Sequence, residues 1–110
     1  MNKTTYLGEL EHMILLAILR LGTAAYGISI RDELESEVGR EVSRSAAYIT
    51  LERLTKKGYL AARMGEPSPE RGGRAKRYYE VTPAGREALR ESGQAHMRLW
   101  AGHEALLEEA

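Results

Sequence analysis

Glycines at positions 22, 39 and 58 divide the first half of the chain into three segments of helical length. Glycine is favoured just beyond the last turn of a helix, because it adopts the left-handed backbone conformation without steric cost. Within each segment the apolar residues also recur at helical spacings. The first sixty residues are therefore predicted to form three short helices.

The first predicted helix spans Leu7 to Leu21, and it is apolar around most of its girth. The second runs from about Tyr26 to Val38, and we expect Ile28, Arg31, Leu34 and Val38 to share a face with Ile30 beside them. Ser43 is a favourable N-cap for a third helix that continues to about Lys57. On that helix Ala47, Leu51 and Leu54 are predicted to point inward.

The second half of the chain predicts a β-hairpin and one more helix. Tyr59 to Met64 and Arg77 to Val81 have strand composition, and Gly65 to Gly73 between them is rich in glycine, proline and charge. Thr82 is the predicted N-cap of the last helix, with Pro83 in its first turn, and this helix is expected to continue to about Leu107.

The order helix, helix, helix, strand, strand, helix is that of a winged helix-turn-helix followed by an extra helix. The predicted fold class is thus mainly α with a small β-hairpin. Residues 1–81 would form the DNA-binding domain and residues 82–110 a C-terminal dimerisation helix, within one structural unit. In such a fold the third helix enters the major groove and the hairpin tip contacts the flanking backbone.

The distribution of charge along the chain favours an anionic partner, although the sixteen basic and sixteen acidic residues cancel overall. Between Arg40 and Arg77 there are ten basic and four acidic residues, a net charge of +6. A basic middle third in a neutral chain is typical of a local contact with an anion such as DNA. An uneven but merely solvated surface is the alternative.

The candidate DNA contacts lie on the third helix and on the hairpin tip. Arginine pairs with guanine, serine contacts a base edge or a phosphate, and an exposed isoleucine meets a thymine methyl group. Glycines at the tip let the backbone approach DNA closely while the basic groups attract it. The predicted set is Ser43, Arg44, Ser45, Tyr48, Ile49 and Arg53 on the helix, and Arg71, Arg74, Lys76 and Arg77 at the tip. Packing at the rim of the core is the competing interpretation of Tyr48 and Ile49.

Several classes of protein are disfavoured by what the sequence lacks. There is no cysteine, hence no disulfide and no thiolate metal site. The longest apolar run, Met13 to Leu19, is far shorter than a membrane helix, and no signal peptide is evident, so a cytoplasmic protein is expected. No glycine-rich phosphate loop follows a strand. We therefore expect no enzyme, no cofactor and no metal.

The last helix carries an apolar seam that predicts a partner helix. Its members follow a heptad-like spacing and are Leu89, Gly93, His96, Trp100, His103 and Leu107. One interpretation is a homodimer anchored by Trp100. The other is a pocket for a hydrophobic or aromatic effector at the dimer interface, lined by Leu16, Met97 and Trp100. His96 and His103, seven residues apart, would also respond to pH.

Four stretches of the sequence resemble the PadR family of bacterial transcriptional regulators. They are LGELEHMILLAIL, YGISIRDELE, VSRSAAYITLERLTKKGYL and GEPSPERGGRAKRYYEVTPAGREAL, which together extend from Leu7 to Leu89. The short length resembles the compact subgroup with a single C-terminal helix. The chain departs from the family at Ser45, Ala47 and Ile49, where many members have Gly, Leu and Pro, so the base preference does not transfer.

The resemblance implies a homodimer in which the last helix packs against the first helix of the partner. It also implies a palindromic operator, usually bound as a repressor, and contact of Tyr48 and the start of the third helix with DNA. The expected function is a sequence-specific DNA-binding transcriptional regulator, whose binding is relieved by a small-molecule effector. The alternative is a winged-helix adaptor that binds proteins and not DNA.

Overall fold

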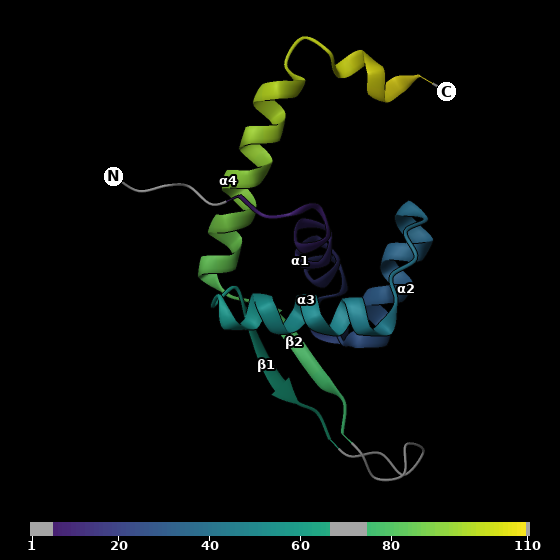
Figure 1. Cartoon of the computed structure of the whole chain (residues 1–110), viewed down its shortest axis with the longest axis vertical. Coiled ribbons are helices and arrows are strands. Elements are labelled where there is room, and N and C mark those ends of the chain that lie inside the picture. The colour runs from purple at the N-terminus through teal and green to yellow at the C-terminus, as the bar shows by residue number, and fades with distance from the viewer. Residues whose placement is uncertain (1–5, 67–74, 110) are drawn as a thin grey trace.

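A computed structural model describes residues 6–66 and 75–109 of the chain (Figure 1). The mainly α fold with a hairpin is confirmed. The elements are α1 (Glu9–Leu21), the 3-10 turn η1 (Gly22–Ala24), α2 (Gly27–Val38), α3 (Arg44–Lys56), β1 (Leu60–Met64), β2 (Arg77–Val81), α4 (Pro83–Trp100) and a second 3-10 turn, η3 (Glu104–Glu108).

The predicted helix boundaries hold to within two residues for the first three helices. Gly22, Gly39 and Gly58 all have positive φ, at 62°, 68° and 83°, as expected of glycines that end helices. At the start of α3, the Ser43 hydroxyl accepts a hydrogen bond from the Ala46 amide at 3.1 Å. Such a cap satisfies one of the amides that a helix start leaves without an internal partner.

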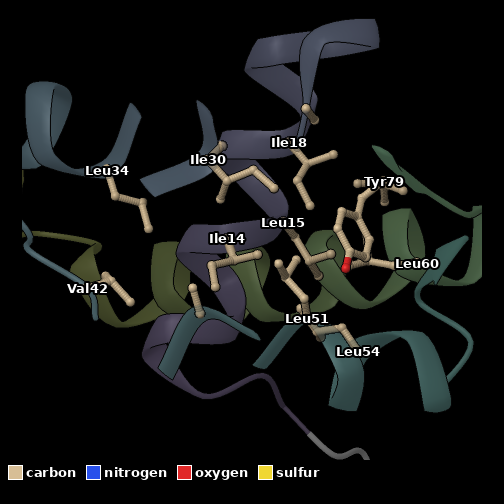
Figure 2. Close-up of a cluster of buried hydrophobic side chains, with 14 of the residues drawn as sticks. Ile14, Leu15, Ile18, Ile30, Leu34, Val42, Leu51, Leu54, Leu60 and Tyr79 are labelled. Atoms are coloured by element: carbon tan, nitrogen blue, oxygen red, sulfur yellow. The ribbon is translucent and has the colours of Figure 1, made fainter. Parts of the chain in front are cut away.

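The core forms around α1, which lies between α4 and α2 in the view of Figure 1. The largest fully buried side chains come from all three of the first helices, and they are Ile14, Leu15, Ile30 and Leu54. Figure 2 shows Leu60 and Tyr79 of the hairpin packed against this cluster. Burial of such apolar surface is the main favourable contribution to the stability of a small domain.

Only part of the predicted apolar face of α2 is buried in the core. Ile30 and Leu34 are buried, but Ile28 and Val38 are exposed. Ile28 lines a cleft beside α3 and Val38 lines a groove beside α1. The core reaches α2 along one stripe of residues four apart, because α2 packs on α1 and α3 from one side only.

The two strands form an antiparallel hairpin that is joined to the start of α2. Leu60 pairs with Val81 and Met64 with Arg77 at its two ends. Beyond the hairpin, Tyr26 forms an isolated bridge with Tyr78, and the Tyr79 amide donates to the Ala25 carbonyl at 2.9 Å. The hairpin is therefore bonded to the helical body and not only packed on it.

The last helix begins against the hairpin and then leaves the domain (Figure 1). Gly85 in its first turn lies so close to the carbonyl oxygen of Tyr59 that a Cβ atom there would clash with it. Further along, the Ser92 hydroxyl accepts a hydrogen bond from the Leu7 amide at 3.0 Å. These contacts fix the direction in which α4 departs.

The prediction that the last helix continues to Leu107 is wrong. α4 ends at Trp100, after which Ala101 is extended and Gly102 has a φ of 89°. Such a backbone interrupts the helical hydrogen-bond pattern. The residues beyond it therefore no longer follow the axis of α4. His103 and Leu107 thus do not extend the seam of α4, and His96 and His103 do not share one helical face.

Candidate nucleic-acid interface

The outward face of α3 exposes two large side chains that the core does not use. Tyr48 is 56% exposed and Ile49 is 55% exposed. On the opposite side Ala47, Leu51 and Leu54 are buried, as predicted. Exposed large apolar side chains on a charged helix face are typical of a contact surface.

The first turn of α3 carries three exposed polar residues, Ser43, Arg44 and Ser45. The Ser43 hydroxyl is engaged in the helix cap and lies 3.4 Å from the hydroxyl of Ser45. Ser43 therefore positions this turn, while Arg44 and Ser45 extend from it toward solvent. Free amides at a helix start also attract an anion.

A cleft of about 330 Å³ opens beside this turn, between the start of α2, α3 and β2. Its charged lining residues are all basic among those that the structure describes: Arg31, Arg44, Lys76 and Arg77. The aromatic lining residues are Tyr26, Tyr48 and Tyr79. The cleft thus brings two of the DNA contacts predicted on the third helix together with two of those predicted for the hairpin tip. These are Arg44 and Tyr48, and Lys76 and Arg77.

Tyr26, Arg31 and Tyr79 are cleft residues that the sequence argument missed. They are distant from most of the third helix along the chain. The bridge between Tyr26 and Tyr78, and a hydrogen bond that Arg31 donates to the Val42 carbonyl at 2.9 Å, hold them beside it. The one sequence signal at these positions is Tyr26 itself, an aromatic residue directly before Gly27 at the predicted start of the second helix.

Arg77 and Lys76 have defined partners at the end of the hairpin strands nearest the tip. The Arg77 guanidinium lies 3.2 Å from the Glu52 carboxylate on α3. The Lys76 ammonium lies 3.9 Å from the centre of the Tyr26 ring. Arg71 and Arg74, predicted for the tip, lie outside the described residues.

Arg53 is turned toward α1 and away from the cleft. Its guanidinium lies 3.8 Å from the carboxylate of Glu11, which also accepts a hydrogen bond from Lys57 at 2.9 Å. Burial alone would raise the pKa of the Glu11 carboxyl. The hydrogen bonds from Lys57 and from the Gly8 amide, together with the charges of Lys57 and Arg53, outweigh burial and hold that pKa below its ordinary value.

The three residues predicted to line an effector pocket are not gathered by one chain into a common groove. Leu16 lines a groove of about 210 Å³ between α1 and α2, and neither Met97 nor Trp100 belongs to it. Met97 is exposed near the far end of α4, where Trp100 is the last residue. A pocket made of these three side chains would require a second copy of the chain.

Two histidines meet where α1 passes α4. The rings of His12 and His96 are stacked, with centroids 5.7 Å apart and an angle of 20° between their planes. Burial, and then the positive charge of His96, lower the pKa of His12.

Among residues 6–66 and 75–109, no three histidine or carboxylate side chains are grouped as metal ligands would be. None of the helices in those ranges is both long and apolar enough to cross a membrane.

Three helices with an exposed face on the third, followed by a hairpin bonded back to the second, define a winged helix-turn-helix protein. A family model described as "Transcriptional regulator PadR-like family" matches residues 15–91. The chain belongs to this family, and it is accordingly a transcriptional regulator and not an enzyme.

Solved structures of similar proteins agree with this assignment. A PadR-like transcriptional regulator from Bacillus cereus is 26% identical, with a TM-score of 0.71 over 92% of this chain and 93% of that one. A PadR family regulator from Eggerthella lenta is 27% identical, with a TM-score of 0.67 over 93% and 88%. PadR of Bacillus subtilis in complex with operator DNA is 26% identical, with a TM-score of 0.63 over 74% of this chain and 46% of that longer chain. Among curated proteins, none matches this chain in sequence.

Proposed function

We propose that the protein is a sequence-specific DNA-binding regulator that acts as a homodimeric repressor on a palindromic operator. The observation that carries this proposal is the juxtaposition of two features. One is the exposed face of α3 with Tyr48 and Ile49, and the other is a cleft whose charged lining, within the part of the chain that the structure describes, is all basic. The structural similarity to PadR of Bacillus subtilis, which was solved with operator DNA, supports it.

In this proposal α3 lies in the major groove. Arg44, Ser45 and Ile49 face the base edges, where a guanine, a polar edge and a thymine methyl are their natural partners. Lys76 and Arg77 contact phosphates of the adjoining backbone, and so do Arg71 and Arg74 at the hairpin tip. Phosphate contacts set affinity and register, while base contacts set sequence preference.

The dimer would form through residues 82–110. Met97, Leu99 and Leu107 are exposed apolar residues in a region that makes few contacts with its own domain. A helix with such a surface is stabilised when another apolar surface covers it. Two-fold symmetry would then place two copies of α3 about one helical turn of DNA apart, which is why a palindrome is expected.

Selection of bound fragments from a random duplex library tests the proposal. We expect a palindromic consensus with half-sites about one helical turn apart. On that consensus, the logarithm of the binding constant should fall with the logarithm of salt concentration, with a slope of about −7 if a dimer neutralises about eight phosphates. A chain that binds no duplex even at low salt would instead be a protein-binding adaptor.

Ile49→Ala separates base recognition from folding. Because Ile49 is more than half exposed, the free energy of unfolding should change by less than about 0.5 kcal/mol. The affinity for the consensus should fall while the affinity for random duplex stays constant, since a methyl contact distinguishes bases and not phosphates. Equal loss on both duplexes would contradict a role of Ile49 in recognition.

Relief of binding by a small-molecule effector completes the proposal. Across a two-fold axis, Leu16 of one copy would approach Met97 and Trp100 of the other and enclose an apolar site. Trp100 is the single tryptophan of the chain, so its fluorescence reports on that site without labelling. Planar aromatic compounds that release DNA should also change the fluorescence of Trp100. Release without such a change would place the effector elsewhere.

A further inference from the structure

Tyr26 and Tyr78 form a contact between the start of α2 and the hairpin, which we call the aromatic clasp. Their rings meet edge to face, with centroids 5.5 Å apart and planes at 62°. The backbones of the same two residues form the isolated bridge described above. Edge-to-face pairing of aromatic rings is favourable beyond the area that it buries.

A cation lies over each ring of the aromatic clasp. On the cleft side, the Lys76 ammonium is 3.9 Å from the centre of the Tyr26 ring. On the other side, the Arg63 guanidinium is 4.8 Å from the centre of the Tyr78 ring. Lys76 lines the cleft with Arg44 and Tyr48, whereas Arg63 lines a different groove. The clasp therefore holds one positive charge on the side of α3 and another away from it.

The backbone beneath the clasp leaves Tyr78 and Lys76 little freedom. The Gly65 amide donates to the Lys76 carbonyl at 2.7 Å. A Cβ atom on Gly65 would lie 2.6 Å from a ring carbon of Tyr78, so only glycine lets the ring rest there. With its backbone held, the long side chain of Lys76 is restricted mainly by the face of Tyr26.

We propose that Tyr26 is a positioning residue for DNA binding, which acts by holding the ammonium group of Lys76 in the basic cleft. A lysine side chain loses considerable conformational entropy when it is immobilised on a phosphate. A ring that already orients the ammonium reduces that loss, as preorganised groups do in general. This inference rests on the proposed DNA-binding function.

A double-mutant cycle on the selected duplex tests the inference, with the dissociation constant measured by fluorescence anisotropy. Tyr26→Leu should weaken binding about two- to five-fold, which is the size expected of an exposed cation–π contact. Lys76→Met should weaken binding more than Tyr26→Leu does. The double variant should bind no more weakly than Lys76→Met alone, because Tyr26 acts through Lys76. Tyr26→Phe keeps the ring and should bind like the wild type.

Arg63→Met is the matched control, since it removes an equal charge from the other end of the clasp. It should change the dissociation constant less than Lys76→Met does. Thermal unfolding, monitored by circular dichroism, establishes that each variant folds. If Tyr26→Leu does not fold, Tyr26→Met takes its place. Additive losses in the double variant, or binding by Tyr26→Phe as weak as that of Tyr26→Leu, would overturn the inference alone. A wild-type protein that binds no duplex would overturn the proposed function as well.

Discussion

The carboxylate of Glu52 on α3 lies 3.2 Å from the guanidinium of Arg77 on β2, and this ion pair ties the hairpin to the predicted recognition helix. The Glu52 side chain is 31% exposed and that of Arg77 is 42% exposed. A half-exposed ion pair contributes little to stability, because solvent screens it. Its larger effect is to withdraw one positive charge from a surface that is otherwise basic.

Glu52→Gln should therefore strengthen DNA binding. The substitution removes a negative charge beside the cleft and leaves Arg77 free to contact a phosphate. We expect the dissociation constant to fall a few-fold, and the salt slope to steepen by up to about 1 for each added phosphate contact. Glu35→Gln, at an exposed position on α2, removes an equal charge and is the control. Weaker binding by Glu52→Gln would mean that the ion pair positions Arg77 for its contact.

Glu11→Ala should destabilise the fold although it removes a charged group. Glu11 is 7% exposed and connects the start of α1 with the end of α3 through Gly8 and Lys57. The loss of these hydrogen bonds to a buried carboxylate should lower the free energy of unfolding by about 1–3 kcal/mol, as measured by urea denaturation. Glu9→Ala, which removes a more exposed carboxylate two residues away, should cost much less. Similar losses for both variants would refute a special role of Glu11.

The lowered pKa of Glu11 also predicts how stability depends on pH. Because the folded protein holds this pKa below its unfolded value, the contribution of Glu11 is fully present above about pH 4.5. It is lost as the pH falls through the folded pKa. Glu11→Gln should therefore flatten the stability profile in this acidic range. A profile with the same slope as that of the wild type would contradict the assignment.

The stacked pair of His12 and His96 predicts a second loss of stability nearer to neutrality. The folded pKa of His12 is lowered, so the unfolded chain binds the proton more readily. Stability is then complete above about pH 6.5 and is lost as the pH falls through the folded pKa of His12. The melting temperature should drop over this range in the wild type and less in His12→Gln.

Leu99→Glu should separate the two copies of the proposed homodimer. Leu99 is 81% exposed on α4, so a charge there costs the isolated chain little. In a dimer that covers this surface, the same charge would be buried without a partner, which is strongly unfavourable. Sedimentation velocity should show a monomer for Leu99→Glu and a dimer for Gln94→Glu, which adds the same charge on the same helix. A dimer in both cases would move the interface away from Leu99.

Local patterns were sufficient to predict the elements of this protein. Gly39 and Gly58 ended helices, and Ser43 and Thr82 capped them, because these preferences depend on the backbone within one turn. The inward side of α3 followed from the period of the helix, and so did its exposed Ile49. The order of the elements then indicated the winged helix, and the motifs resembled the family that the comparisons confirmed.

The positions of side chains relative to one another were decided only by the tertiary structure. Arg53 turns to Glu11, forty-two residues earlier in the chain, and Tyr26 joins Tyr78, fifty-two residues later. Neither contact leaves a periodic signal, since each depends on how whole elements pack. The end of α4 at Trp100 was missed because apolar spacing continues past Gly102, whose backbone interrupts the helix. The spacing of residues was thus enough to determine which face of α3 is exposed. The packing of whole elements determined which charged side chains lie beside that face.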